Sequence, residues 1–109
     1  MYKIIMTCMM LTGITIATYA QNGKKVFETY CWGCHHQTAE AFGPSFKEIA
    51  SKRTAEVISA MITDPDGVSK VLGYSRNAMP AFTLTSSEMD SITKYILSYK
   101  ENNATKADK

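Results

Sequence analysis

Apolar residues recur at helical spacing in three stretches of this 109-residue chain. Within residues 22–30 and 54–62, apolar side chains three and four positions apart share one face of a helix. A third stretch is the most regular, with Met89, Ile92, Ile96 and Tyr99 on one face. Because no stretch alternates apolar and polar residues long enough to form a strand, the pattern predicts an all-α fold.

Residues with strong positional preferences mark where these helices begin and end. Thr85 and Glu88 have the spacing of a capping box, so the last helix should begin beside Thr85. Asn22 is the expected cap of the first helix. Pro65 should end the helix over residues 54–62, because a proline forces the residue before it out of helical geometry.

Two further segments lie between these helices. A short helix is expected over residues 65–72, with Asp64 as its cap and Gly73 as its terminator. Residues 36–50 contain the helix-breaking pair Gly43-Pro44 and are expected to form a loop. No internal linker interrupts the chain, so residues 21–101 are expected to form one domain.

The two ends of the chain differ from the rest. Residues 1–20 combine an early positive charge, an uncharged apolar run and a small residue at Ala20, which is typical of a secretory signal peptide. An uncleaved membrane anchor is the alternative, although the run is short for a span. A lipoprotein signal is disfavoured because Cys8 precedes most of that run. Cleavage would leave a periplasmic protein with no stable membrane insertion, and the polar residues 102–109 are expected to form a mobile tail.

Composition and charge narrow the function classes. Twelve basic and ten acidic residues are interspersed and the net charge is +2, so nucleic acid is not expected as a partner. Removal of residues 1–20 would leave 89 residues, which is little chain for burying an apolar core. Small exported domains usually add disulfides or a cofactor. The remaining cysteines, Cys31 and Cys34, would close too short a loop to stabilise the fold much.

The sequence Cys31-Trp32-Gly33-Cys34-His35 is a C-x-x-C-H motif, the attachment sequence for c-type haem. Two thiols three residues apart can add to the two vinyl groups on one edge of a porphyrin. The next residue is then held beside the iron, where a neutral imidazole can bind it. The motif therefore predicts one covalently bound haem c, with thioethers to Cys31 and Cys34 and with His35 as an axial ligand of the iron.

Paired cysteines have three other common uses in proteins. A structural zinc site needs four ligands, and the chain after residue 20 has no other Cys and only one further His, His36. A thiol–disulfide oxidoreductase would need a βαβ framework that the pattern does not show. A plain structural disulfide is the third alternative. Export, the all-α pattern and the length together favour haem.

The order of these features resembles the class I cytochromes c, the small monohaem electron carriers. The likeness covers residues 22–100. It runs from the first helix through C-x-x-C-H, the Gly-Pro pair, the middle helix and a Met79-Pro80 pair to the last helix. The resemblance implies a small cytochrome c fold, in which helices wrap around one covalently attached haem.

The resemblance also implies roles for individual residues. In this family the methionine at the position of Met79 is the second axial ligand, on the face of the iron opposite His35. A backbone carbonyl of the Pro44 loop would accept the imidazole N–H, which fixes the orientation of the ring. The first and last helices would cross where four residues meet, namely Gly23, Phe27, Ile92 and Tyr95.

The other candidate ligands are disfavoured by their positions. Met61 belongs to the apolar face of the helix over residues 54–62, and Met89 fits a hydrophobic staple, so both are expected in the core. His36 adjoins the proximal ligand and cannot reach the opposite face, so an exposed histidine is expected there. Met79 lies outside the expected helices and directly before a proline.

Three further side chains near these motifs are candidates for contact with the haem. Trp32 is expected to cover a haem edge as an apolar side chain. Tyr74 and Arg76 could reach the haem propionates. The alternative, which is equally good, is that Tyr74 and Arg76 are ordinary loop residues that do not contact the haem.

With His35 and Met79 as ligands the iron would be six-coordinate, which leaves no open position for a substrate or oxygen. We therefore expect a monomeric periplasmic electron carrier of a bacterial respiratory chain, with no enzymatic activity. Its partners would be a membrane oxidase, reductase or dehydrogenase, each bound transiently. Two alternatives stay open. One is a dedicated haem subunit of a larger oxidoreductase complex, and the other is a haem sensor or peroxidase-like protein in which Met79 dissociates.

Overall fold

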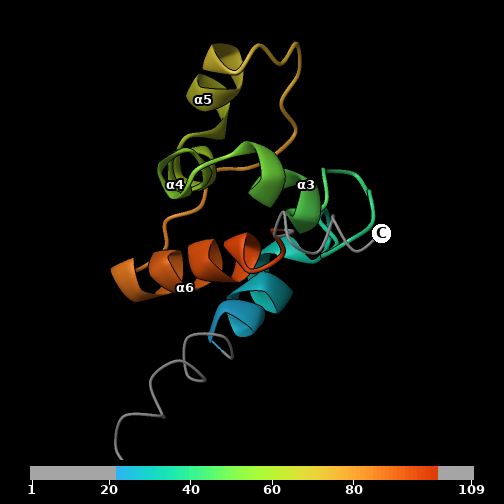
Figure 1. Cartoon of the computed structure of the whole chain (residues 1–109). Coiled ribbons are helices and arrows are strands. Elements are labelled where there is room, and N and C mark those ends of the chain that lie inside the picture. The colour runs from blue at the N-terminus through green and yellow to red at the C-terminus, as the bar shows by residue number, and fades with distance from the viewer. Residues whose placement is uncertain (1–21, 101–109) are drawn as a thin grey trace, which may run out of the picture.

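The computed structural model describes residues 22–100, and within this range every regular element is a helix (Figure 1). The described part begins with α-helical residues 22–26, which continue as the π-helix η1. The elements from there onward are η1 (Phe27–Cys31), α3 (Phe46–Lys52), α4 (Ala55–Thr63), α5 (Pro65–Val71) and α6 (Ser86–Leu97). The predicted all-α class is confirmed. The expected signal segment and tail lie outside the described residues.

The predicted starts of α6 and α4 are formed by side-chain caps. The Thr85 hydroxyl accepts a hydrogen bond from the Glu88 amide at 3.1 Å. The Glu88 carboxylate in turn accepts one from the Thr85 amide at 3.0 Å, which completes the capping box. Thr54 caps α4 by accepting a bond from the Val57 amide at 3.3 Å. These caps satisfy amides that have no partner within their own helix.

Both ends of the short helix α5 agree with the prediction. Asp64 caps its start by accepting a bond from the Gly67 amide at 3.1 Å. At its other end Gly73 has a φ of +84°, a left-handed conformation that glycine adopts without strain. The Tyr74 amide then donates to the Ser69 carbonyl at 2.9 Å, so the helix ends in a Schellman motif.

Two predicted details are wrong. The loop expected over residues 36–50 ends at position 45, because Ser45 caps the additional helix α3 by accepting a bond from the Glu48 amide at 3.1 Å. Phe46 and Ala50 of this helix are buried, so tertiary packing stabilises a segment that the Gly43-Pro44 pair marked as irregular. Asn22 is itself helical and is therefore not the flanking cap of the first helix.

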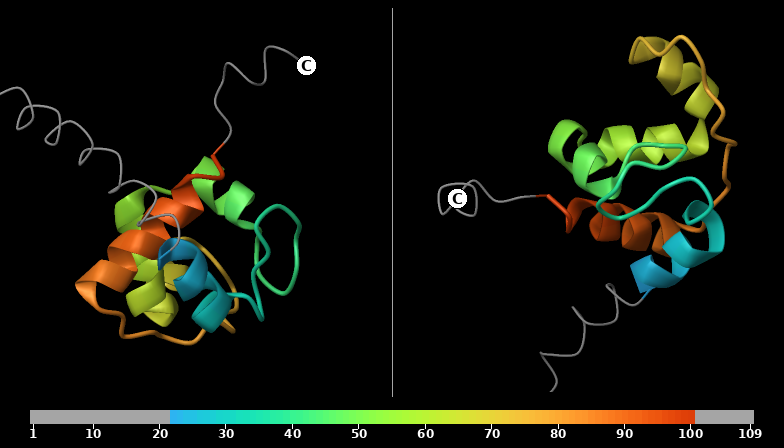
Figure 2. Two further views of the ribbon diagram at one scale, coloured as in Figure 1. Left: turned by 90° about the horizontal axis from the view of Figure 1, so that it is seen from below. Right: turned by 90° about the vertical axis from the view of Figure 1, so that its right-hand side faces the viewer.

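Helix α6 lies between the first helix on one side and α3 and α4 on the other (Figures 1 and 2). Helix α5 packs against α4. The side chains at the centre of this arrangement form one buried cluster, made of Val26, Phe27, Phe46, Ile58, Ile62, Ile92 and Ile96. None of the helices in residues 22–100 is long and apolar enough to cross a membrane.

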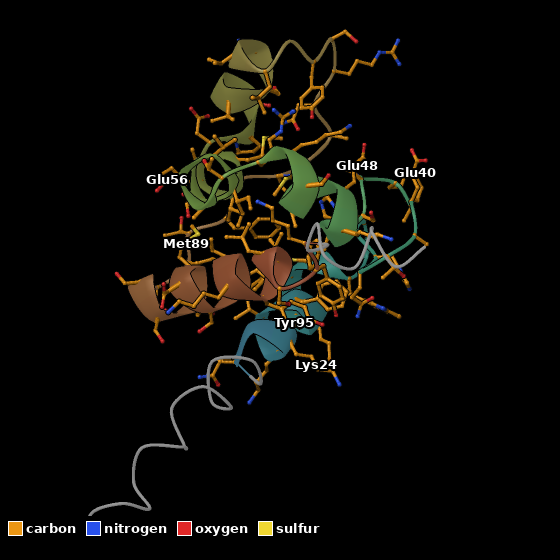
Figure 3. The ribbon with its side chains drawn as sticks, in the orientation of Figure 1. Lys24, Glu40, Glu48, Glu56, Met89 and Tyr95 are labelled. Atoms are coloured by element: carbon orange, nitrogen blue, oxygen red, sulfur yellow. The ribbon has the colours of Figure 1, made fainter. Side chains whose placement is uncertain are left out.

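The first helix and α6 cross at the residues that the resemblance implied. A Cβ atom on Gly23 would lie 2.5 Å from the Tyr95 Cβ, so only glycine permits this approach. The rings of Phe27 and Tyr95 are 5.8 Å apart, and Ile92 is completely buried beside them. Tyr95 is visible where α6 meets the first helix (Figure 3). The crossing holds the end of the first helix, and with it the two cysteines, against the core.

Candidate functional site

The C-x-x-C-H motif begins at the last residue of the first helix, where the helix widens. The Trp32 amide donates to the Phe27 carbonyl at 2.9 Å, five residues back, which is the π-helical pattern. Cys31 is half-buried and Cys34 is exposed, and both are free thiols. The His35 amide donates to the Cys31 carbonyl at 2.9 Å, so the motif folds back on the helix end.

The pKa of the Cys31 thiol helps to decide between haem attachment and thiol–disulfide exchange as the use of this motif. Burial raises the pKa of the Cys31 thiol to about 11. Thiol–disulfide oxidoreductases depend on a thiolate nucleophile with a lowered pKa in the C-x-x-C pair. A thiol that stays protonated at neutral pH does not fit that chemistry, so the environment of Cys31 disfavours an oxidoreductase.

The zinc alternative also lacks support. Within residues 22–100 no group of three or more His, Cys, Asp or Glu side chains is arranged to hold a metal ion. A structural zinc site needs four such ligands in closed geometry. The cysteine pair therefore has no partners for a protein-only metal site in the described part of the chain.

The hydrogen bond of His35 determines which ring nitrogen is free. Its Nδ1 atom lies 2.7 Å from the Pro44 carbonyl oxygen. A carbonyl can only accept, so Nδ1 carries the proton and donates. In the neutral ring Nε2 then carries the lone pair, so it is the nitrogen that can bind a metal. The bond to Pro44 that the resemblance implied is present.

Gly43 and Phe46 fix the plane of the His35 ring, a role that the sequence did not indicate for either residue. Gly43 packs directly on the ring, because a Cβ at this position would lie 2.5 Å from the His35 Cε1 atom. Phe46 stacks near it, with ring centroids 5.8 Å apart and planes inclined by 28°. The spacing of Ser45 and Glu48, which matches a capping box, was the signal that could have placed Phe46 on a helix.

The segment between η1 and α3, residues 32–45, is called the His35 loop below. Backbone hydrogen bonds tie its two arms together, from the Gly43 amide to the Cys34 carbonyl at 2.7 Å and from the Phe46 amide to the His36 carbonyl at 3.0 Å. The Lys47 amide donates to the Gln37 carbonyl at 3.0 Å. The ring of His35 is thus carried by a loop that its own main chain closes.

His36 is exposed, as expected, and its ring has a structural contact. Its Nδ1 atom accepts hydrogen bonds from the Thr38 and Ala39 amides, each at 3.1 Å. These bonds form a tight turn within the His35 loop.

The three methionines differ in how they pack. Met79 and Met89 are half-buried and pack against the buried cluster, and Met89 lies on the side of α6 that faces α4 (Figure 3). Met61 is half-buried on α4, but its side chain does not pack on that cluster. The expectation that Met61 is a core residue is therefore not supported, which makes Met61 the control that a test of Met79 needs.

Residues 72–85, which connect α5 to α6, carry Met79 and are called the Met79 segment below. The Phe82 amide donates to the Ile62 carbonyl of α4 at 2.9 Å. The rings of Phe82 and Tyr30 lie 5.7 Å apart, so the segment meets the end of the first helix next to Cys31. The structure therefore brings the Met79 segment and the cysteine motif to neighbouring parts of the core.

The three candidates for haem contact have different surroundings. Tyr74 accepts a hydrogen bond from the Arg53 guanidinium at 2.9 Å. Arg76 is exposed. The Trp32 side chain is 68% exposed in the protein, so its expected role as cover for a haem edge stays a prediction.

Comparison with known proteins gives the family. The model of the cytochrome c family matches residues 20–100 of the chain. A search of curated proteins gave no match. Among solved structures, a cytochrome c from Rhodothermus marinus has 24% sequence identity and a TM-score of 0.64, over 76% of this chain and 78% of that one.

A second solved structure has the same fold. It is an engineered cytochrome c from Rhodothermus marinus, bound to a carbene intermediate, with 26% identity and a TM-score of 0.63. The similarity covers 84% of this chain and 86% of the engineered protein. The resemblance noted in the sequence is confirmed. The residues present also fit the group, because two free thiols adjoin an imidazole whose Nδ1 contacts the Pro44 carbonyl, which leaves Nε2 as the nitrogen available to bind a metal. The chain therefore belongs to the cytochrome c family, whose cofactor is covalently attached haem c, and it is a haem-based electron carrier.

Proposed function

We propose that Cys31 and Cys34 form the two thioether bonds and that His35 and Met79 are the axial ligands of the iron. The observation that carries this proposal is the 2.7 Å contact between the His35 Nδ1 and the Pro44 carbonyl. It leaves Nε2 as a metal-binding atom and sets the direction in which it points. Met79 is the proposed second ligand because it packs on the core from a non-helical segment before Pro80.

When bound, haem c supplies a one-electron couple between ferric and ferrous iron. The ligand atoms of His35 and Met79 are both neutral, and a neutral thioether favours the less charged ferrous state. The chain would fill both axial positions, so it would leave none for a substrate. Gly43 and Phe46 hold the imidazole plane, which limits the rearrangement that accompanies a change in charge.

The exposure of the motif supports electron exchange at the protein surface. Cys34 is exposed and Trp32 is largely exposed, so the proposed attachment edge lies at the surface. A partner that docks over these two residues would come close to the cofactor without any opening of the fold. Transient redox complexes of this kind have small interfaces.

The proposal extends to the cellular role. A signal peptide at residues 1–20 would deliver a periplasmic protein with the domain of residues 21–101 and the short polar tail of residues 102–109. The protein would act as a monomeric carrier in a bacterial respiratory chain, without enzymatic activity. Its partners would be a membrane oxidase, reductase or dehydrogenase.

The test is the visible spectrum of the purified ferric protein and of Met79→Ala. Iron bound by a methionine sulfur has a weak far-red absorption band. We expect this band and a low-spin spectrum in the unchanged protein, and we expect Met79→Ala to lose the band. Met61→Leu and Met89→Leu are the matched controls, because each removes one half-buried sulfur while conserving volume.

Each outcome identifies a ligand or rejects one. A band that disappears only in Met79→Ala supports the proposed ligand set. A band that survives in Met79→Ala and disappears in Met61→Leu would assign the sulfur ligand to α4 instead. A high-spin spectrum in the unchanged protein, altered by carbon monoxide, would mean that the sixth position is open and that the sensor or enzyme alternative holds.

A further inference from the structure

The Met79 segment has no regular secondary structure, so specific contacts must hold Met79 in place. Pro80 follows Met79 and has no N–H group, which removes one backbone hydrogen bond from this stretch. On one side of Met79, the Phe82 amide is bonded to Ile62 of α4. On the other side, the contact is made by a side chain, that of Asn77.

The Asn77 amide group bonds to both polar groups of the Met79 backbone. Its Oδ1 atom accepts from the Met79 N–H at 3.1 Å, and its Nδ2 atom donates to the Met79 carbonyl at 3.0 Å. One side chain thus replaces the partner strand that would satisfy these groups in a sheet. Asn77 is half-buried, as is Met79, so these bonds are partly shielded from water.

A third hydrogen bond connects Asn77 to the body of the protein. Its Nδ2 atom also donates to the Asp66 carboxylate on α5 at 2.7 Å. A carboxylate acceptor makes this bond stronger than one between neutral groups. Helix α5 packs on α4, which carries Ile62, so both anchors of Met79 lead to the same pair of helices.

Neither aspartate nor alanine could make this set of bonds at position 77. An aspartate has no N–H to donate to the Met79 carbonyl or to Asp66, and an alanine has neither donor nor acceptor. The Asn77 amide uses its oxygen once and its nitrogen twice, so its hydrogen-bonding capacity is directed at Met79 and α5.

We propose that Asn77 is a positioning residue that holds the Met79 sulfur on the iron, with Asp66 as its anchor on α5. This inference rests on the proposed role of Met79 as a ligand. Asn77 itself touches neither the iron nor a partner protein. Its loss would let the Met79 backbone move while the helices stay folded, so the sulfur would leave the iron in a larger fraction of molecules.

Binding of added imidazole to the ferric holoprotein measures that fraction. Imidazole can bind only where Met79 has left, so its apparent affinity rises in proportion to the open population. Two or three lost hydrogen bonds predict a rise of about tenfold to a hundredfold in Asn77→Ala. The far-red band should also disappear at a lower temperature in this variant, while the far-ultraviolet circular dichroism of the helices melts nearly as in the unchanged protein.

Three further variants separate this role from a general loosening of the segment. Asp66→Ala removes the anchor but keeps the bonds between Asn77 and Met79, so an intermediate rise in imidazole affinity is expected. Asp66→Asn keeps an acceptor oxygen and should stay within about twofold of the unchanged protein. Thr85→Ala is the matched control, because it removes the hydrogen bond from the Glu88 amide at the far end of the same segment without touching Asn77.

The order Asn77→Ala, then Asp66→Ala, then the other two variants supports the proposal. An imidazole affinity in Asn77→Ala equal to that of the unchanged protein overturns it, and so does a Thr85→Ala variant that matches Asn77→Ala. If Asn77→Ala yields no holoprotein, an intermediate rise in Asp66→Ala supports the proposal and an unchanged affinity overturns it. A far-red band that does not depend on Met79 overturns the ligand assignment, and this inference with it.

Discussion

The two segments that carry the proposed iron ligands are held in different ways. In the His35 loop, main-chain bonds join the arms, and the ring of His35 itself donates to a carbonyl, that of Pro44. In the Met79 segment, backbone bonds hold the first residues, such as Tyr74 on Ser69, and join Phe82 to Ile62. Around Met79 itself the contacts are made by the side chain of Asn77, and the Tyr74 side chain adds a bond to Arg53.

This difference has a consequence for how each side responds to change. A carbonyl acceptor persists whatever side chain the residue carries, so substitution of Pro44 would leave an acceptor for His35. The bonds of Asn77 vanish with a single substitution. The His35 loop should therefore hold its ligand whenever the domain is folded, whereas the Met79 segment can release its ligand from a folded domain.

The largest effect is expected where the His35 loop joins the core. Phe46 is 1% exposed, and its ring lies 5.1 Å from that of Phe27 and 5.8 Å from that of His35. Phe46→Ala should lower the free energy of unfolding by about 3–5 kcal/mol, because it leaves a cavity under the imidazole. Denaturant unfolding of the holoprotein measures this loss. Phe82→Ala, at a half-buried ring of the Met79 segment, should cost less, and equal losses would contradict the comparison.

A smaller effect is expected from crowding the His35 ring. Gly43→Ala would place a Cβ 2.5 Å from the ring and should cost about 1–3 kcal/mol, since neither the closed loop nor the stacked ring can move freely. Gly33→Ala is the matched control, because nothing lies within 4 Å of a Cβ at that position. The free energies of unfolding of both holoproteins are compared. Two variants of equal stability would show that the loop yields more easily than its backbone bonds indicate.

The smallest expected effect depends on pH and concerns Tyr99, whose ring lies near that of Phe46. Burial, and then the hydrogen bond to Tyr95, raise the pKa of Tyr99 from 10.0 to about 12. Because the folded state keeps this proton longer than the unfolded state, the resulting stability is complete below pH 10 and is lost as the pH rises toward 12. Ultraviolet titration should show one late-ionising tyrosine.

Tyr99→Phe provides the control for that titration. The late ionisation should be absent in this variant, and its stability should fall less steeply than that of the unchanged protein above pH 10. A late ionisation that persists in Tyr99→Phe would assign it to another tyrosine. It would also mean that water reaches the aromatic rings beside Tyr99 more easily than their packing indicates. Among them is the buried ring of Phe46, 6.5 Å from the ring of Tyr99.

The parts of the fold that were predicted correctly depend on short-range patterns. The capping box at Thr85, the cap at Asp64 and the terminator at Gly73 each involve residues within a few positions of one another. Such interactions form whatever the rest of the chain does, so their spacing is visible in the sequence. The resemblance to the cytochrome c family also predicted two longer-range features correctly. These are the hydrogen bond between His35 and Pro44 and the helix crossing at Gly23.

The parts that were missed depend on contacts or on competing signals. Helix α3 was obscured because the Gly43-Pro44 pair outweighed the spacing of Ser45 and Glu48, although both signals were present. Met61 has helical spacing like a core residue, yet only the packing of α4 decides where its side chain lies. The partners of Asn77 include a residue eleven positions away, and no local pattern indicates that pairing.

The sequence by itself determined the chemistry of the motif from Cys31 to His35. The C-x-x-C-H motif, its place at the end of a helix and the all-α class all follow from neighbours in the chain. The tertiary structure alone decided that Gly43 and Phe46 clamp the imidazole, and that Asn77 and Asp66 hold the Met79 backbone. The reason is that close approach and hydrogen bonding between distant residues require the packed helices to bring them together, whereas a motif needs only the covalent chain.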